Sequence, residues 1–237
     1  MLIKTGRSGK GSLRRAFAPF ACALVALCLA SCGGGAGNSN SKSLDDPETP
    51  AANVKRNVKP EPDAQAVVLE IESGGFSYGK IVIELYPNVA PRMVERFKRL
   101  AQEGFYNGTA FHRVNPQTGV VQGGDPNSKD DDPSNDGMGG SPYDDVPAEF
   151  SDVPFDRGIV GAARSQSIDS ANSQFFITLR RVPQWDDNYT VFGRVIEGMD
   201  NAQAIAGAPT RPNSENPADK IVIKSATLQP RSNFQKQ

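Results

Sequence analysis

The sequence contains few cysteines and almost no histidine. Of its 237 residues, three are cysteines and one is a histidine. The cysteines are Cys22, Cys28 and Cys32, so all of them lie near the N-terminus. The chain beyond Cys32 therefore has no pair of thiols for a disulfide, and it must be stabilised by its hydrophobic core.

The chain beyond its N-terminus also lacks an excess of positive charge. Residues 1–31 hold five of the 26 Lys and Arg residues and none of the 27 Asp and Glu residues. The 21 basic and 27 acidic residues that remain give a net charge of −6. This balance argues against a nucleic-acid partner and against electrostatic binding to an anionic membrane surface.

The N-terminus has the three-part pattern of a secretion signal. Residues 1–15 are basic without any acid, and Ala16–Ala30 is an apolar run too short for a comfortable membrane span. The run ends in Leu29-Ala30, and Ser31 and Cys32 come next. This Leu-Ala-Ser-Cys sequence resembles the processing site of a bacterial lipoprotein. The resemblance implies that residues 1–31 are a signal peptide and that Cys32 becomes the acylated first residue. The alternative is an ordinary signal peptide followed by an incidental cysteine.

Residues 32–65 form a polar segment rich in Gly, Ser, Asn, Pro and acidic residues. Such a segment cannot bury enough apolar surface to offset its chain entropy, so we expect a disordered tether. Together with a lipidated Cys32, the tether predicts an exported protein anchored to the cell membrane or outer membrane, in the periplasm or facing the surface. The lipid, rather than side-chain charge, is the predicted membrane contact.

From Ala66 onwards the sequence predicts strands with one buried face, because short runs alternate between apolar and polar residues. Helical spacing after Pro91 predicts one helix that ends at Gly104, and residues 197–206 predict a second one. We expect eight strands, near residues 67–71, 80–86, 111–114, 120–121, 158–163, 174–179, 190–195 and 220–228. The pattern alone does not decide between a barrel and a sandwich.

The stretch 110–125 holds the best candidate for chemistry. It contains the only histidine, His112, followed directly by Arg113, and it ends in Gln-Gly-Gly-Asp from Gln122. Two short strands joined by a turn would bring Arg113 close to Gln122. Alternation puts His112 on the opposite face from Arg113. A surface hairpin with a solvated arginine fits this stretch equally well.

Beyond these local patterns, several motifs over about residues 66–228 resemble those of cyclophilins. They occur in the same order as in that family and at nearly the same spacing. The motifs are Gly79–Tyr86 (GKIVIELY), Ala90-Pro91, Phe97, Gly104–Tyr106 (GFY), Phe111–Val114 (FHRV), Gln122–Pro126 (QGGDP), Asn172–Ile177 (NSQFFI) and Tyr189–Gly193 (YTVFG). The resemblance implies a mainly β fold, a closed eight-stranded antiparallel barrel capped by two α-helices. This domain would occupy residues 66–228 and would be followed by a short tail at 229–237.

The resemblance also implies a peptidyl-prolyl cis-trans isomerase, which accelerates rotation about the bond before proline. Unaided, this rotation faces a barrier of about 18–20 kcal/mol and takes tens of seconds. No covalent bond is made or broken, so the reaction needs no nucleophile, metal or cofactor. It needs an apolar slot for the ring, polar groups that fix the flanking peptide, and a cation near the prolyl nitrogen. The implied partners are proline-containing polypeptides, bound by a monomer that assists folding in the cell envelope.

The resemblance assigns roles to individual residues. Arg113 matches the catalytic arginine, whose fixed charge and planar donors suit the task better than lysine. Phe176 would form the floor of the proline pocket, and Gln122 would bind the substrate backbone. The implied substrate-binding residues are Phe176, Gln122, Val120, Ala163, Arg164, Trp185 and Tyr189. His112 matches a family residue that is not the catalytic group, so we do not expect it to act as a general base.

Two departures from the family pattern affect the pocket. Eight residues separate Arg113 from Gln122, one more than usual, and Gly119 stands where the family has a phenylalanine. Losing such a side chain removes apolar wall worth roughly 1.5–3 kcal/mol. Trp185 falls at the usual leucine position or, if its loop is one residue shorter, at the position of a family tryptophan. Both placements predict that Trp185 lines the pocket, and packing in the core near the rim is the alternative.

Two other functions remain open from the sequence. Gly119 favours a non-catalytic module that uses the groove only to hold a proline-containing partner. Another alternative is a lipoprotein whose barrel binds a non-peptide ligand.

The acidic run Asp130–Asp136 resembles a calcium loop, but Tyr143 stands where the closing glutamate is expected. We therefore expect a solvated loop and no metal site.

Overall fold

The computed structural model describes residues 53–235, which lie in one compact unit. The predicted signal peptide and the predicted lipidation site, Cys32, lie outside the described residues. In the part that is described, no helix has both the length and the apolar character needed to cross a membrane.

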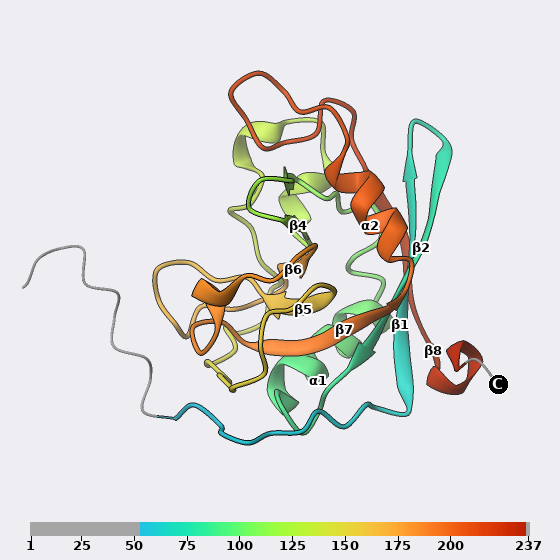
Figure 1. The fold of residues 1–237 in the computed structure, drawn as a ribbon. Helices are drawn as coiled ribbons and strands as arrows, with labels where there is room; N and C mark the ends of the chain where they lie inside the picture. Colours follow the sequence, from blue (N-terminus) through green and yellow to red (C-terminus); the bar gives the residue numbers. More distant parts are fainter. Residues whose placement is uncertain (1–52, 236–237) are drawn as a thin grey trace, which may run out of the picture. The chain divides into compact units, whose positions relative to one another are not determined.

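Across residues 53–235, an eight-stranded antiparallel sheet and two α-helices form the fold (Figure 1). The strands are β1 (Gln65–Ser73), β2 (Phe76–Leu85), β3 (Arg113–Asn115), β4 (Val120–Gly123), β5 (Ile159–Ala162), β6 (Phe175–Thr178), β7 (Val191–Glu197) and β8 (Val222–Pro230). The helices are α1 (Pro91–Gln102) and α2 (Met199–Ala206), with 3₁₀ turns η1 (Pro126–Lys129), η2 (Pro133–Asn135), η3 (Pro183–Trp185) and η4 (Arg231–Phe234). The predicted strands and helices are confirmed in number and order.

The sheet is an open half-barrel, so the prediction of a closed barrel is wrong. Its strand order is β3-β4-β6-β5-β7-β2-β1-β8, which leaves β3 and β8 as the end strands within the described residues. The segment that leads into β3 crosses the gap, where Ala110 forms an isolated bridge with Val222. There the N–H of Phe111 also donates to the carbonyl of Ile221 at 2.9 Å. In β3 the N–H of Val114 donates to the carbonyl of Glu215 at 2.8 Å, and β3 and β8 form no ladder, so the sheet stays open.

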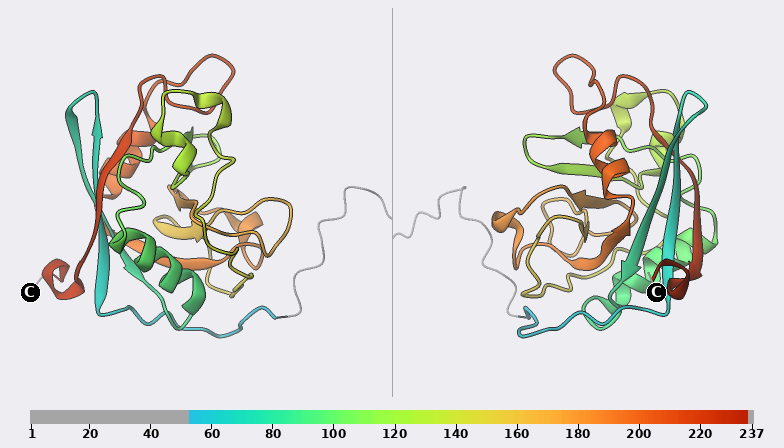
Figure 2. Two further views of the ribbon diagram at one scale, coloured as in Figure 1. Left: turned by 180° about the vertical axis from the view of Figure 1, so that it is seen from behind. Right: turned by 45° about the vertical axis from the view of Figure 1, so that its right-hand side comes forward.

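The two helices pack against the sheet at different ends (Figure 2). α1 begins at Pro91, whose fixed φ suits the first turn of a helix. α2 follows Gly198, which has a φ of +87°. A Cβ on Gly198 would lie 2.0 Å from the carbonyl oxygen of Lys80, so only glycine fits where α2 leaves the sheet.

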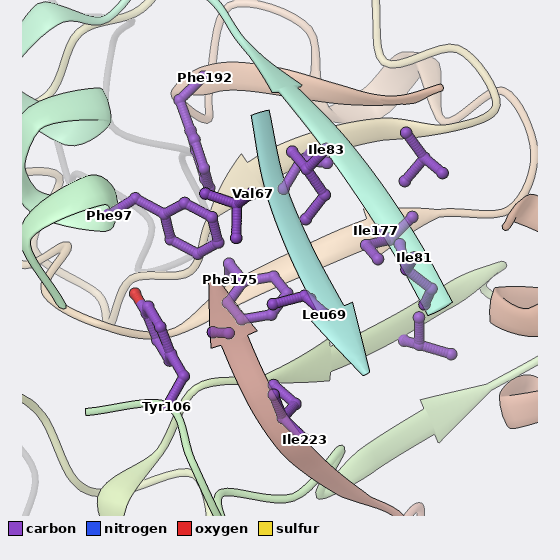
Figure 3. Packing of buried hydrophobic residues seen from close by; sticks show 14 of the residues in the cluster. Val67, Leu69, Ile81, Ile83, Phe97, Tyr106, Phe175, Ile177, Phe192 and Ile223 are labelled. Atoms are coloured by element: carbon purple, nitrogen blue, oxygen red, sulfur yellow. The ribbon is translucent and has the colours of Figure 1, made fainter. Parts of the chain in front are cut away.

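The hydrophobic core lies inside the curve of the sheet (Figure 3). Phe97 of α1 packs against the rings of Phe175 and Phe192, with ring centres 5.2 and 5.0 Å apart. Figure 3 shows part of this core, formed by Val67, Leu69, Ile81, Ile83, Phe97, Tyr106, Phe175, Ile177, Phe192 and Ile223. The sheet strands therefore bury one face against α1, as the alternation in the sequence predicts.

β6 separates two hydrophobic clusters. Phe175 and Ile177 belong to the main core, whereas Phe176 packs in a second cluster. Successive side chains of a strand point to opposite faces, so a single apolar strand serves both sides of the sheet. Phe176 is in this way directed away from the main core.

The chain already contacts the domain before the predicted boundary at Ala66. Lys55 forms a parallel bridge with Ser151, and its amino group donates to the carbonyl of Val89 at 2.8 Å. Lys98 of α1 forms an ion pair with Asp63 at 2.9 Å. We call residues 53–64 the N-terminal strap. The strap differs from the disordered tether expected up to residue 65, because its polar groups find partners on the domain.

The residues after the predicted end of the domain also make contacts. β8 continues to Pro230, and Arg231 of η4 forms an ion pair with Glu84 at 2.9 Å. The amino group of Lys80 lies 5.2 Å from the centre of the Phe234 ring. The predicted tail at 229–237 thus includes the end of β8 and the η4 turn.

Candidate active site

Four residues lie next to one another across four neighbouring strands. Arg113 of β3 pairs in register with Gln122 of β4, Gln122 with Phe176 of β6, and Phe176 with Gly161 of β5. Residues directly opposite on antiparallel strands point to the same face of a sheet. The guanidinium, the amide and the phenyl ring therefore share one face, and we call Arg113, Gln122 and Phe176 the cross-strand row.

An aromatic cluster surrounds one end of the cross-strand row. It consists of Phe155, Phe176, Trp185 and Tyr189. The ring of Phe176 lies 4.8 Å from that of Trp185 and 5.7 Å from that of Tyr189, measured between centres. Val120, which is 1% exposed, packs in the same cluster. The edge-to-face contacts favour a stable arrangement of the rings around an apolar surface.

Gly161 leaves room for the phenyl ring at this position. A Cβ on Gly161 would lie 2.3 Å from Cζ of Phe176 and 2.9 Å from Cε1 of Phe155. Real carbon atoms do not approach so closely, so any side chain here would displace both rings. The importance of Gly161 is not visible in the sequence, because a glycine within a short strand gives no sign of what packs above it.

The guanidinium of Arg113 is held by a carboxylate from a distant loop. Its Nε donates to one oxygen of Glu215, and the side-chain amide of Asn115 donates to the other. The backbone carbonyl of Glu215 accepts from the N–H of Val114 at 2.8 Å. Partial burial alone would raise the pKa of Glu215, but the hydrogen bonds from Arg113 and Asn115 outweigh it and lower this pKa below its ordinary value.

A second set of hydrogen bonds holds Gln122. Arg113 Nη1 lies 3.5 Å from Gln122 Oε1, a long contact. Gln122 Nε2 donates to Gln174 Oε1 at 2.9 Å, and Gln174 Nε2 donates to the carbonyl of Gly139 at 2.8 Å. Each amide thus has a fixed neighbour, which limits the rotation of Gln122. The side chain of Arg113 remains 42% exposed, so these contacts do not bury it.

The space beside Gly119 is filled by Arg180. Gly119 has a φ of +77°, and a Cβ on it would lie 2.5 Å from Cγ of Arg180. The guanidinium of Arg180 donates to the carbonyl of Gln117 in the same turn. Where the family pattern has a phenylalanine, the hydrocarbon part of the Arg180 side chain therefore lies next to the glycine backbone.

The other predicted binding residues lie around the aromatic cluster. Trp185 ends the η3 turn and contacts Phe176, so its ring belongs to the cluster. The guanidinium of Arg164 lies 4.7 Å from the centre of the Tyr189 ring. The N–H of Ala163 donates to the carbonyl of Gln174 at 3.0 Å. The N–H of Ala163 is therefore already bonded, and a substrate strand that pairs with residues 163–164 would use their remaining backbone N–H and C=O groups.

His112 lies apart from the cross-strand row. It is 5% exposed, and neither ring nitrogen has a hydrogen-bond partner among the described residues. A Cβ on Gly137 would lie 3.6 Å from its Nε2, so the ring packs beneath the acidic loop. Burial lowers the pKa of His112, in spite of the nearby carboxylate of Asp125. The His112 ring is thus buried against the acidic loop, away from the cross-strand row.

The acidic loop uses its carboxylates to cap its own turns. Asp125 accepts from the N–H of Asn127, and Asp132 accepts from the N–H of Ser134, both at 2.9 Å. Among residues 53–235 no group of three or more His, Cys, Asp or Glu side chains is arranged to hold a metal ion. Capping therefore accounts for Asp125 and Asp132.

Comparison with known proteins places most of the described chain in one family. Residues 67–228 match the family described as cyclophilin type peptidyl-prolyl cis-trans isomerase/CLD. A probable peptidyl-prolyl cis-trans isomerase of Brucella suis is 48% identical over 150 residues, which cover 61% of this chain and 76% of that protein. A peptidyl-prolyl cis-trans isomerase of Schizosaccharomyces pombe is 35% identical over 159 residues, covering 64% of this chain and 95% of that protein.

A solved structure shows the same similarity. The crystal structure of a Cryptosporidium parvum cyclophilin type peptidyl-prolyl cis-trans isomerase, obtained in the presence of the dipeptide Ala-Pro, superposes with a TM-score of 0.61. It is 28% identical and covers 69% of this chain and 98% of that one. The chain belongs to the cyclophilin-type peptidyl-prolyl cis-trans isomerases, and the enzyme class expected from its motifs is confirmed.

Replacing Gly161 by alanine should reduce both stability and activity. The added methyl group would push Phe176 and Phe155 aside, and overpacking of this kind costs about 1–3 kcal/mol. Urea unfolding should show the loss of stability, and a proline-peptide isomerisation assay should show a higher KM. A variant with unchanged unfolding and unchanged KM would contradict the position assigned to the Phe176 ring.

His112 should make the protein less stable as the pH falls. The pKa of His112 is lower in the folded protein than in the unfolded chain, where it is about 6.5. Between these two pKa values the unfolded chain binds the proton and the folded protein does not. Stability is thus lost as the pH decreases through this window. Thermal unfolding of wild type and His112→Gln between pH 7.5 and 5 should show a steeper loss for the wild type. Equal slopes would contradict a buried neutral histidine.

Proposed function

We propose that Arg113 is the catalytic residue of this isomerase and that the aromatic cluster binds the proline ring. The observation that carries the proposal is the cross-strand row, which puts the guanidinium on the same face as Phe176 with only Gln122 between them. A proline ring seated on Phe176 would have its nitrogen directed along this row. The apolar surface and the cation required for the reaction are then adjacent.

The guanidinium would act by weakening the partial double bond of the X–Pro peptide. This double-bond character depends on the nitrogen lone pair, and it sets a barrier of about 18–20 kcal/mol. A donor directed at the prolyl nitrogen localises the lone pair and so favours the twisted state. A millionfold acceleration requires lowering the barrier by about 8 kcal/mol. Glu215 would keep the donor oriented, which removes the cost of ordering it in each cycle.

The remaining residues would hold the peptide while its bond rotates. Gln122 presents an amide beside Arg113, and such a group suits a substrate backbone carbonyl or N–H. Val120, Trp185 and Tyr189 would form the sides of the proline pocket. Ala163 and Arg164 would contact the chain that precedes the proline. These roles require one chain only, and we propose that the enzyme acts as a monomer.

The substrates would be exposed X–Pro segments of unfolded or loop polypeptide. The Cryptosporidium parvum relative was solved in the presence of Ala-Pro. By analogy, a small residue followed by proline is a suitable first substrate for this chain. An accessible site on the face of a sheet also suits extended polypeptide rather than folded protein.

Replacing Arg113 by alanine should lower kcat/KM by about 10²–10³-fold, the usual effect of removing one oriented electrostatic donor. Arg113→Lys should lose less, because the charge remains while the planar fork is lost. A protease-coupled assay with an Ala-Pro peptide would measure both variants. Circular dichroism should show that each is folded.

Equal, near-background rates for wild type and Arg113→Ala would contradict catalysis by this residue. That result would favour a module that holds proline-containing partners, the function that Gly119 suggested from the sequence. Arg180 is the matched control, because it is an arginine that lies beside Gly119 without belonging to the cross-strand row. Arg180→Ala should lose far less activity than Arg113→Ala.

We propose further that the enzyme assists folding in the cell envelope, anchored through a lipid on Cys32. The basic and apolar leader at residues 1–30 and the small residues before Cys32 support this location. An anchored isomerase would meet polypeptides as they arrive across the membrane. The net charge of −6 without the leader leaves the lipid as the main membrane contact.

Cys32→Ser should release the protein from membranes. In bacteria grown with a labelled fatty acid, the wild type should carry the label and sediment with membranes, whereas the variant should lose the label. The kcat/KM of the purified variant should stay unchanged, because the site lies in residues 53–235. A variant that still carried the label would contradict lipidation at this cysteine.

A further inference from the structure

The N-terminal strap reaches the loop that carries two members of the aromatic cluster. Arg56 Nη1 donates to both carboxylate oxygens of Asp187, at 2.8 and 3.0 Å. Asp187 stands between Trp185 and Tyr189 in the sequence, 131 residues from Arg56. A segment outside the sheet therefore touches the wall of the proposed proline pocket.

Asp187 has an uncommon backbone conformation. Its φ is +60°, in the left-handed region that few residues other than glycine occupy, although aspartate enters it more readily than most. The neighbouring residues of the loop are fixed from within the domain. Asp186 accepts from the N–H of Phe155 at 2.9 Å, and the carbonyl of Asn188 accepts from Arg164 Nε at 3.3 Å. Among the described residues, the carboxylate of Asp187 finds its partner on the strap.

The strap presents Arg56 from an ordered backbone. Lys55 on one side is bridged to Ser151. On the other side, the N–H groups of Asn57 and Val58 donate to the carboxylate of Asp152. The Val58 side chain packs against the hydrophobic cluster that contains Phe176. Exposed ion pairs contribute little when both side chains are free, but here the backbone is held on both sides of Arg56.

We propose that Arg56 is a positioning residue of the proline pocket. By holding Asp187 in its left-handed conformation, Arg56 sets the rings of Trp185 and Tyr189 against Phe176. This inference rests on the proposed role of the aromatic cluster in binding proline. It makes the segment that joins the predicted tether to the domain a part of the substrate-binding machinery.

Replacing Arg56 by alanine in the protein from residue 32 onwards should raise KM for an Ala-Pro peptide about 3–10-fold and change kcat little, because Arg113 keeps its partners. Trp185 is the only tryptophan of the chain, so its emission reports directly on the loop. The emission should shift in Arg56→Ala and return partly in Arg56→Lys. Arg99→Ala breaks an exposed pair with Glu103 on α1 and is the matched control, with KM and emission unchanged.

A second variant separates positioning from general loss of structure. Glycine adopts the left-handed conformation without strain but offers no carboxylate, so Asp187→Gly removes the partner of Arg56 while the backbone conformation stays accessible. In the Asp187→Gly background, Arg56→Ala should have no further effect. Unchanged KM and unchanged Trp185 emission in Arg56→Ala would overturn the proposal, as would an equal effect of Arg56→Ala in both backgrounds.

The two proposals fail in different ways. If Arg113→Ala retained wild-type activity, the assignment of the catalytic residue would fall, while the Trp185 emission would still report whether Arg56 orders the loop. If Arg113→Ala lost activity but Arg56→Ala changed neither KM nor emission, the positioning role alone would fall.

Discussion

The pairing of Arg113 with Glu215 is the interaction on which the account of the site depends. An arginine side chain on a sheet face has many rotamers, and fixing one of them costs conformational entropy. The carboxylate takes Nε, while Gln122 lies beside Nη1. The guanidinium is thus already oriented before a peptide binds. Both side chains remain about two-fifths exposed, so the pair orders the cation without closing the site.

The cross-strand row exists because β6 divides its apolar residues between two faces. Phe175 and Ile177 stabilise the main core, whereas Phe176 forms the base of the aromatic cluster. Gly161 on β5 makes this arrangement possible, because it leaves the space that the Phe176 ring occupies. Core and site are therefore linked through one strand, and displacement of that strand would affect both.

Local patterns in the sequence were enough to predict the strands, the helices and the closeness of Arg113 to Gln122. These features depend on alternation and short turns, which neighbouring residues determine. The partners of the site residues were not predictable in this way. Glu215 lies 102 residues from Arg113, and Gln174 lies 52 residues from Gln122, so only the tertiary fold brings them together. The family resemblance, in contrast, identified the order of motifs across the whole domain.

The error about the barrel has a physical reason as well. A closed barrel was expected, but β8 meets only the segment before β3, at the bridge of Ala110 with Val222, while the N–H of Val114 in β3 donates to the carbonyl of Glu215. The strap was assigned to the tether because its composition is polar, although backbone N–H groups that meet a carboxylate such as Asp152 can order a polar segment. From the sequence, Gly119 leaves a gap in the predicted pocket wall. Only the structure shows that the Arg180 side chain lies beside this glycine.

The most direct measurement is a high-resolution structure of this protein with an Ala-Pro peptide bound. The account predicts that the proline ring lies on Phe176 and that a guanidinium nitrogen of Arg113 lies within hydrogen-bond distance of the prolyl nitrogen. A proline ring bound elsewhere, or a guanidinium turned away from the peptide, would contradict it.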